Sequence, residues 1–301
     1  MKKLTLLLLA LLYVTLTYAY TERDLLQKQA DINRLKEILV LDRQWVTYPD
    51  YNDRAGWDRF LGTFKDEYIR RGEKRLNYQW QVVKATDYLA FERTGNRQIM
   101  EKPFGANNGA IADLLMAELA EGKGRFVDQL INGVFNACEM TSWALAAHII
   151  VQPSHRALPA YDYPVIDLTS GDLGGLLAWT YHFMRPSFDK VDPEISRRLR
   201  HELQTRILDP YMNNDSFWWM GRNYNGRMLN NWNPWCNSNA LMCFMLLEDN
   251  RDTLAKAVHL TMESVDKFLN YIKADGACEE GPSYCCLLYT SPSPRDYAAS
   301  R

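Results

Sequence analysis

A polar and aromatic stretch in the second half of the chain carries most of the side chains that could do chemistry. Residues 221–239 read GRNYNGRMLNNWNPWCNSN, with seven Asn, two Arg and two Trp. Amides donate and accept hydrogen bonds, guanidinium groups are permanent cations, and indole rings offer flat faces. A sugar-binding cleft uses such groups to hold hydroxyls, carboxylates and pyranose rings. The candidate residues are Arg222, Arg227, Asn230, Asn231, Trp232 and Trp235.

The same composition predicts that this stretch is a loop. In a core helix its amides would be buried without hydrogen-bond partners, which costs free energy. A plainer interpretation is a capping loop whose Asn side chains satisfy the backbone of turns. Composition alone leaves both interpretations open.

A second polar stretch, 275–284, reads DGACEEGPSY. Asp275-Gly276 predicts a turn, and the carboxylates of Glu279 and Glu280 and the phenol of Tyr284 follow it. Taken alone, the stretch is typical of a polar connector.

Length and composition bound the class of protein. The chain has 301 residues, of which 47% are hydrophobic and 24% charged, with a formal net charge of −2. Such a chain buries a sizeable core, which excludes a disordered tail and a disulfide miniprotein. It is not basic enough for a nucleic-acid partner. An anionic partner must therefore be held by a local cluster of side chains.

The first 19 residues predict a signal peptide. Lys2 and Lys3 precede an apolar run from 4 to 16, and Ala19 offers the small residue of a cleavage site. The alternative is a membrane anchor, but the run is shorter than the roughly 18–20 residues that cross a bilayer. No cysteine follows Ala19, which argues against a lipoprotein. We expect a periplasmic or secreted protein with no membrane span after signal removal.

The other end of the chain is unusual. Residues 286–296 read CLLYTSPSPRD, which resembles the translation of a transposase-type sequencing adapter. An ordinary Ser/Pro-rich tail is the alternative. We expect the natural sequence to stop at about Tyr284, residues 285–301 to be non-native, and the gene to continue further.

The remaining cysteines are Cys138, Cys236, Cys243 and Cys278. An exported protein could oxidise them into one or two disulfides. Cys138 and Cys243, however, lie in apolar helical stretches that favour buried thiols. No CxxC pair is present, so we expect no zinc or other metal site.

The elements that must position these residues are helices. Apolar residues recur every three or four positions from Leu254 to Ile272 and from Phe126 to Cys138. Asp192-Pro193 predicts a helix start and Asp209-Pro210 its end. Further helices are predicted around 22–40, 55–71, 76–92, 108–121 and 171–184. The long aromatic loops favour a ring of helical hairpins, an (α/α) toroid, over a coiled-coil bundle. We therefore predict one all-α domain over residues 20–284.

Three motifs together resemble the heparinase II/III-like polysaccharide lyases. These are Asn-Asn-Trp at 230–232, the pattern Asp-Gly-x-x-x-Glu-Gly-Pro-x-Tyr ending at Tyr284, and the Glu-x-Thr-Ser-Trp element at 139–143. Asn231 and Tyr284 are 53 residues apart, close to the family's spacing. The resemblance covers most of the chain that follows the signal peptide.

The resemblance implies a toroid followed by a β-sandwich region, which is missing here, and cleavage of acidic polysaccharides by β-elimination at a uronic acid. Asn231 would neutralise the uronate carboxylate, with Asn230 as a neighbouring candidate. Tyr284 would protonate the leaving oxygen and share the role of base. A free tyrosine has a pKa near 10, so Arg222 and Arg227 would lower it. Trp232, Trp235, Glu139 and Glu280 would contact substrate, and no cofactor is implied in this region.

The sequence departs from the family pattern in two places. Some members carry His beside the neutralising residue, where this chain has Trp232. The family's second base, a His further along, lies beyond the end of this sequence. The five histidines present, including His148 and His259 on helices, are interpreted as structural or exposed. We therefore expect little or no activity from the 301-residue chain and lyase activity from the intact gene product.

Two alternative functions stay open. A glycoside hydrolase on the same toroid would use two carboxylates about 5–10 Å apart, drawn from Asp162, Asp172, Glu279 and Glu280. A non-catalytic glycan-binding protein would share the fold without the chemistry.

Overall fold

The chain folds into helices joined by loops. A computed structural model describes residues 22–223 and 229–272, and within these two ranges it contains no β-strand. The all-α prediction is therefore confirmed. Several predicted features lie outside the described residues: the signal peptide at 1–19, Arg227, Cys278, the 275–284 motif with Glu280 and Tyr284, and the tail at 285–301.

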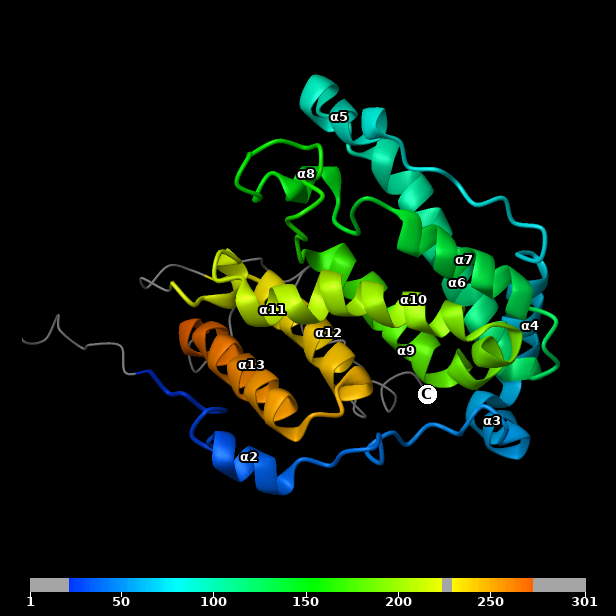
Figure 1. The fold of residues 1–301 in the computed structure, drawn as a ribbon, viewed down its shortest axis with the longest axis horizontal. Helices are drawn as coiled ribbons and strands as arrows, with labels where there is room; N and C mark the ends of the chain where they lie inside the picture. Colours follow the sequence, from blue (N-terminus) through cyan, green and yellow to red (C-terminus); the bar gives the residue numbers. More distant parts are fainter. Residues whose placement is uncertain (1–21, 224–228, 273–301) are drawn as a thin grey trace, which may run out of the picture.

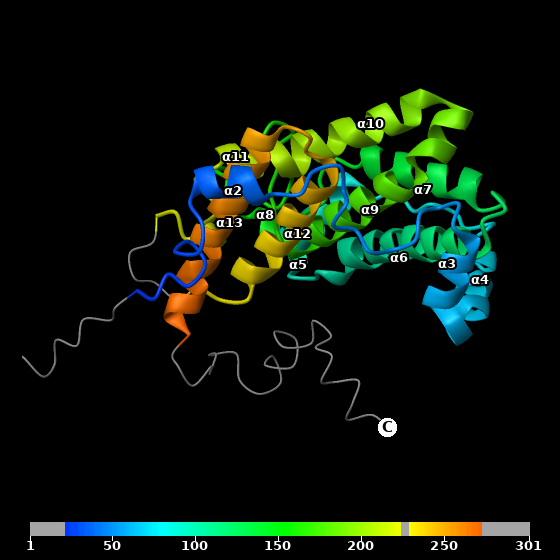
Figure 2. The same ribbon diagram turned by 90° about the horizontal axis from the view of Figure 1, so that it is seen from below.

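Long helices pair into hairpins that pack side by side (Figures 1 and 2). The pairs are α6 (Gln98–Glu121) with α7 (Val127–Glu139), α9 (Leu168–Val191) with α10 (Pro193–Leu203), and α12 (Trp232–Leu247) with α13 (Arg251–Tyr271). The shorter helices are α2 (Ile32–Ile38), α3 (Arg54–Leu61), α4 (Lys65–Glu73), α5 (Ala85–Thr94), α8 (Ala146–Ile149) and α11 (Asp209–Asn213). Tight 3₁₀ turns occur at Gly62–Phe64 and Trp218–Met220, and a π-helical turn at Gln204–Leu208.

Helix α9 is the centre of this arrangement, because it contacts α10 on one side and α12 on the other. Glycines near its start make the approach close. A Cβ at Gly174 would lie 2.9 Å from Cγ1 of Ile207, and one at Gly175 would lie 3.1 Å from Oδ1 of Asn239. The small residues of α9 therefore set the distance between the hairpins on either side.

Most predicted helices are present, with shifted ends. The apolar stripes at 126–138 and 254–272 correspond to α7 and α13. The 171–184 window lies inside α9, and 108–121 forms the second half of α6. The windows 22–40 and 76–92 were too generous, because only α2 and α5 form there. The window 55–71 is divided into α3, a 3₁₀ turn and α4.

The helix that starts at Asp192 confirms one prediction and corrects another. The Asp192 side chain accepts a hydrogen bond from the Glu194 amide at 2.9 Å, and Pro193 occupies the first turn. Asp209-Pro210, however, does not end the helical run. A π-helical turn carries the chain into α11, where Pro210 again stands in the first turn and its missing N–H is not needed there.

The start of the described chain is fixed to its last helix. Backbone amides of Leu26 and Gln27 donate to the carboxylate of Asp266 on α13, and the amide of Arg23 donates to Asn270. Asp266 and Asn270 are fully buried. These contacts place residues 22–30 along α13, from which the chain passes through α2 toward α3 (Figure 1).

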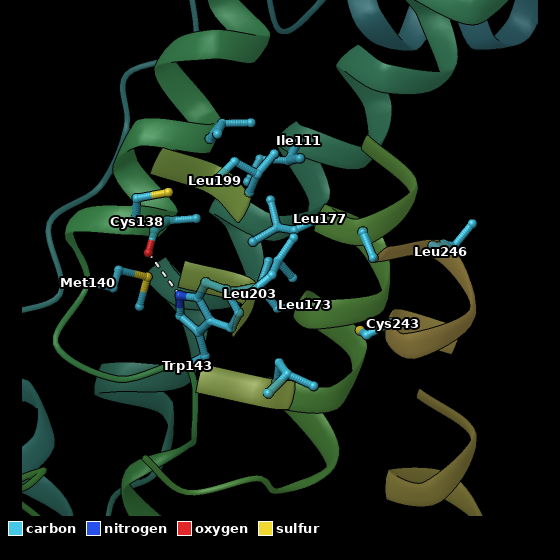
Figure 3. Packing of buried hydrophobic residues seen from close by; sticks show 14 of the residues in the cluster. Ile111, Cys138, Met140, Trp143, Leu173, Leu177, Leu199, Leu203, Cys243 and Leu246 are labelled. Atoms are coloured by element: carbon cyan, nitrogen blue, oxygen red, sulfur yellow. Dashed lines mark hydrogen bonds between the residues drawn. The ribbon is translucent and has the colours of Figure 1, made fainter. Parts of the chain in front are cut away.

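The core between α7, α9 and α10 is packed around Trp143 (Figure 3). Its indole N–H donates to the Ala137 carbonyl at 2.9 Å. Leu177 and Leu203 have no solvent exposure. Cys138 and Cys243 are buried thiols as predicted, and Cys236, the third described cysteine, is also free. Burial raises the pKa of Cys138 and of Cys243 to about 12, so neither thiol is reactive at neutral pH.

Leu177→Ala should lower the free energy of unfolding by about 2–5 kcal/mol, because it removes buried methyl groups and leaves a cavity. Urea unfolding measures the change. Leu158→Ala is the matched control, since Leu158 is 43% exposed, and it should change the free energy by less than about 0.5 kcal/mol. Equal effects of the two variants would contradict the assignment of this core.

Candidate functional site

The candidate site lies where α8 and the starts of α9 and α12 meet. Asn231 is the N-cap residue of α12, and Trp232 is its first helical residue. Asn230 Oδ1 accepts a hydrogen bond from the Trp232 amide at 3.1 Å. The predicted Asn-Asn-Trp motif therefore lies at a helix N-terminus, where the helix dipole favours negative charge.

The prediction that 221–239 is entirely a loop is wrong from residue 232 onward. α12 begins there, and Asn233 and Asn237 are fully buried in it. Their amides find partners on neighbouring segments. Asn233 Nδ2 donates to the Trp219 and Ser264 carbonyls at 2.7 and 2.9 Å, and Asn237 Oδ1 accepts from the Tyr211 hydroxyl at 2.6 Å. Burial of these amides is tolerated because tertiary contacts supply the hydrogen bonds.

Asn231 differs from these two amides. Its exposed fraction is 9%, yet its side chain makes no hydrogen bond to another residue in the described ranges. A mostly buried amide without such a partner is available to bind a ligand.

Aromatic rings surround the first turn of α12. The Trp232 ring lies 4.7 Å from the His148 ring, nearly edge-on, and 5.4 Å from the ring of Trp218. Trp218 is 42% exposed. Together these rings form an aromatic surface beside Asn231, of the kind on which pyranose rings stack.

Trp235 lies one turn further along and binds a carboxylate. Its indole N–H donates to Asp172 Oδ1 at 2.6 Å, and Asn239 donates to the same oxygen at 2.8 Å. Although Asp172 is exposed, the surrounding rings and amides displace water from it. This desolvation raises the pKa of Asp172 above its ordinary value, and the two hydrogen bonds partly oppose the shift.

A histidine–aspartate pair completes the site, and sequence reasoning missed it. His148 Nδ1 lies 2.6 Å from Oδ2 of Asp167, the fully buried N-cap residue of α9. The Asp167 carboxylate also accepts from Ser170 N at 2.7 Å, Leu145 N at 3.1 Å and the Thr169 hydroxyl at 3.0 Å. The other ring nitrogen of His148, Nε2, lies 3.3 Å from an Arg97 nitrogen. The sequence signal was only the Asp-x-x-Ser capping box at 167–170.

The loop between α8 and α9 is held in place by its own polar contacts. Gln152, fully buried, bonds to Arg156, Leu158 and Ala160 through backbone atoms. The Arg156 guanidinium binds both carboxylate oxygens of Glu92 on α5 at 2.9 Å, and this hydrogen bonding lowers the pKa of Glu92 to about 2. These contacts fix the segment that presents Asp167 to His148.

Arg222 and Glu139 are engaged elsewhere. The Arg222 guanidinium pairs with Asp215 and donates to the Tyr211 carbonyl at 3.0 Å, so it fixes the segment after α11. Glu139, at the end of α7, is exposed and lies 3.5 Å from Arg198. Within the described ranges, neither residue contacts Asn231, Trp232 or His148. Asp162 is exposed in the loop before α9.

A hollow of about 260 Å³ opens beside the start of α9. Trp143 of the predicted 139–143 element lines it, together with Tyr163, Ser170, Glu202 and Arg206. Glu202 is buried and paired with Arg198 at 2.9 Å and Arg206 at 2.5 Å. The Trp143 element therefore borders a polar hollow, as the sequence led us to expect of a cleft element.

In the two described ranges, no group of three or more His, Cys, Asp or Glu side chains is placed to hold a metal ion. Among the same residues, no helix combines the length and apolar character required to cross a membrane.

Known proteins add no assignment. No protein-family model matches the chain, and a search of curated proteins found no match.

Asn233→Ala should lower the free energy of unfolding by about 1–3 kcal/mol, because it leaves the buried carbonyls of Trp219 and Ser264 without that donor. Urea unfolding again measures the change. Ser238→Ala on the same helix is the matched control, since Ser238 is exposed, and we expect a change below about 0.5 kcal/mol. An Asn233→Ala variant as stable as the wild type would show that these bonds contribute nothing.

Asp172→Asn should stabilise the protein at neutral pH but not in acid. The pKa of Asp172 is raised in the folded state, so folding binds its proton more tightly and stability falls as pH rises from about 3.8 through the folded pKa. Asparagine carries no charge and can still accept from Trp235. The stability difference between variant and wild type should therefore vanish below pH 3.8. Thermal unfolding across pH tests this, with Asp162→Asn as an exposed control that should show no such trend.

Proposed function

We propose that this protein is an exported polysaccharide lyase that cleaves uronic-acid-containing polysaccharides by β-elimination. The observation that carries the proposal is the amide of Asn231, unpaired within the described ranges, at the positive end of α12 and beside Trp232 and His148. The amide and the helix end suit a carboxylate, and the aromatic rings suit a sugar.

Electrostatics explain why such a site would help the reaction. β-Elimination removes the hydrogen on C5 of the uronic acid, next to the carboxylate, and this carbon acid is very weak. Negative charge develops on the carboxylate as the proton leaves. Asn231, with Asn230 beside it, and the helix N-terminus would stabilise that charge through preorganised dipoles.

Tyr284 is the proposed acid that protonates the leaving glycosidic oxygen. It lies outside the described residues, 12 positions after Ile272. α12 and α13 form a hairpin, so the end of α13 lies on the same side as the start of α12 (Figures 1 and 2). An extended chain spans about 3.3–3.6 Å per residue, so 12 residues are ample to reach the Asn231 region. The direction of α13 thus supports the pairing.

The proposed fold is an incomplete (α/α) toroid. The hairpins α6–α7, α9–α10 and α12–α13 are the repeating units that such a ring requires, and α9 joins neighbouring units through its contacts with α10 and α12. A β-sandwich encoded beyond this sequence would complete the cleft and supply the family's second base.

A glycoside hydrolase is less well supported. It requires two carboxyl groups with separate roles, and Asp172, with its raised pKa, suits an acid. Its charged neighbour Asp167, however, is fully buried and saturated by four donors, which leaves it unable to act as nucleophile or base.

The test uses the protein encoded by the uninterrupted gene, incubated with heparan sulfate, chondroitin sulfate, hyaluronan and alginate. We expect near-ultraviolet absorbance to rise on one of these polymers as the C4=C5 bond forms. Tyr284→Phe should lower kcat about 10²–10⁴-fold and keep binding, and Asn231→Ala should lower it about 10²–10³-fold. The 301-residue chain should bind the same polymer with little turnover.

Tyr161→Phe is the control, since Tyr161 is 91% exposed and should leave turnover unchanged. New reducing ends without a double bond would identify a glycoside hydrolase, and binding without any product would identify a glycan-binding protein. Either result would overturn the lyase proposal.

A further inference from the structure

We propose that His148 is the base that takes the C5 proton, with Asp167 as its positioning residue. This inference rests on the proposed lyase function and assigns a catalytic residue within the described chain.

The pair has the geometry that a proton acceptor requires. Asp167 accepts from Nδ1 of His148 at 2.6 Å, so the neutral ring carries its proton there and Nε2 keeps a free lone pair. Three further donors hold the Asp167 carboxylate: Ser170 N, Leu145 N and the Thr169 hydroxyl. A carboxylate bonded in this way stays ionised and fixes both the tautomer and the orientation of the ring.

The imidazole also lies beside the proposed substrate groups. Its ring is 4.7 Å from the Trp232 ring, and Trp232 directly follows Asn231. The His148 side chain is 14% exposed, so the ring is largely shielded but not sealed. A sugar on the aromatic surface with its carboxylate at Asn231 would place C5 within reach of this part of the site.

The charged groups around His148 come from three directions. Asp167 faces Nδ1 from the start of α9, and Arg97, the residue before α6, approaches Nε2 at 3.3 Å. Arg97 is itself paired with Glu101 at 2.6 Å. α12 contributes the uncharged Trp232. An incoming carboxylate would attract Arg97, and this attraction would draw the guanidinium away from the lone pair of Nε2.

The step balances without a cofactor. The C5 proton moves to Nε2, and the electrons of the C5–H bond form the C4=C5 double bond. The C4–O bond breaks, and its electron pair stays on the glycosidic oxygen, which takes the proton of Tyr284. The imidazolium and the tyrosinate then exchange protons with water.

A purely structural role explains the pair less well. Asp167 caps α9 through Ser170 and holds Leu145 through its backbone, so both tasks are done without the imidazole. His148 is therefore dispensable to the cap, and its second nitrogen is directed toward an exposed arginine rather than a backbone group.

The test compares His148→Asn with the wild type in the intact gene product, on whichever uronate polymer gives unsaturated product. We expect kcat to fall about 10²–10⁴-fold with KM little changed, and the acid limb of the pH–kcat profile to disappear. His259→Asn, a histidine on α13 paired with Glu263, should change neither quantity. Thermal unfolding confirms that both variants fold.

A measurement on the wild-type 301-residue chain keeps the inference testable should the variant fail to fold. Imidazole proton–nitrogen NMR should show His148 protonated at Nδ1, and a hyaluronan hexasaccharide or the matching uronate oligomer should shift its Nε2 signal. Unchanged kcat and pH profile in His148→Asn, or an Nε2 signal indifferent to every oligomer, would overturn the assignment. A wild-type protein that forms no unsaturated product would instead refute the lyase function itself.

Discussion

The buried carboxylate of Asp167 is the constraint on which the site depends. A fully buried charge is tolerated only when donors surround it, and here the donors come from the segment before α8, from α8 itself and from the first turn of α9. Satisfying this one charge therefore brings three segments together. It also fixes the His148 ring, so the same hydrogen bonds that stabilise the start of α9 determine which imidazole nitrogen remains open.

A second polar network does the same for α12. Asn233 and Asn237 bond to Ser264 on α13, and Asn237 bonds to Tyr211 on α11. These buried amides hold the first turn of α12 against its neighbours. Asn231, immediately before them, is left without a partner in the described ranges. Structural amides thus fix the helix, and the amide at its end is available for binding.

Long, periodic helices could be predicted from the sequence, and the site only in part. The stripes that became α7 and α13 follow the period of a buried helix face, which is a local property. The start of α12 was misjudged because the partners of Asn233 lie 14 and 31 residues away. His148 and Asp167 are 19 residues apart, with a loop between them whose path depends on Glu92 and Gln152. No local pattern shows that such residues meet.

The charges at the site give it a polarity that a uronate polymer would match. Asp167 is neutralised by its four donors, and Arg97 and the N-terminus of α12 present positive potential near Asn231. Asp172 lies on the same face, bonded to Trp235 and Asn239. A carboxylate would be drawn to the Asn231 end and repelled from Asp172, whose open oxygen instead suits a sugar hydroxyl. A chain laid across this face would therefore bind in one direction, with its acidic ring over Trp232 and a neutral ring toward Trp235.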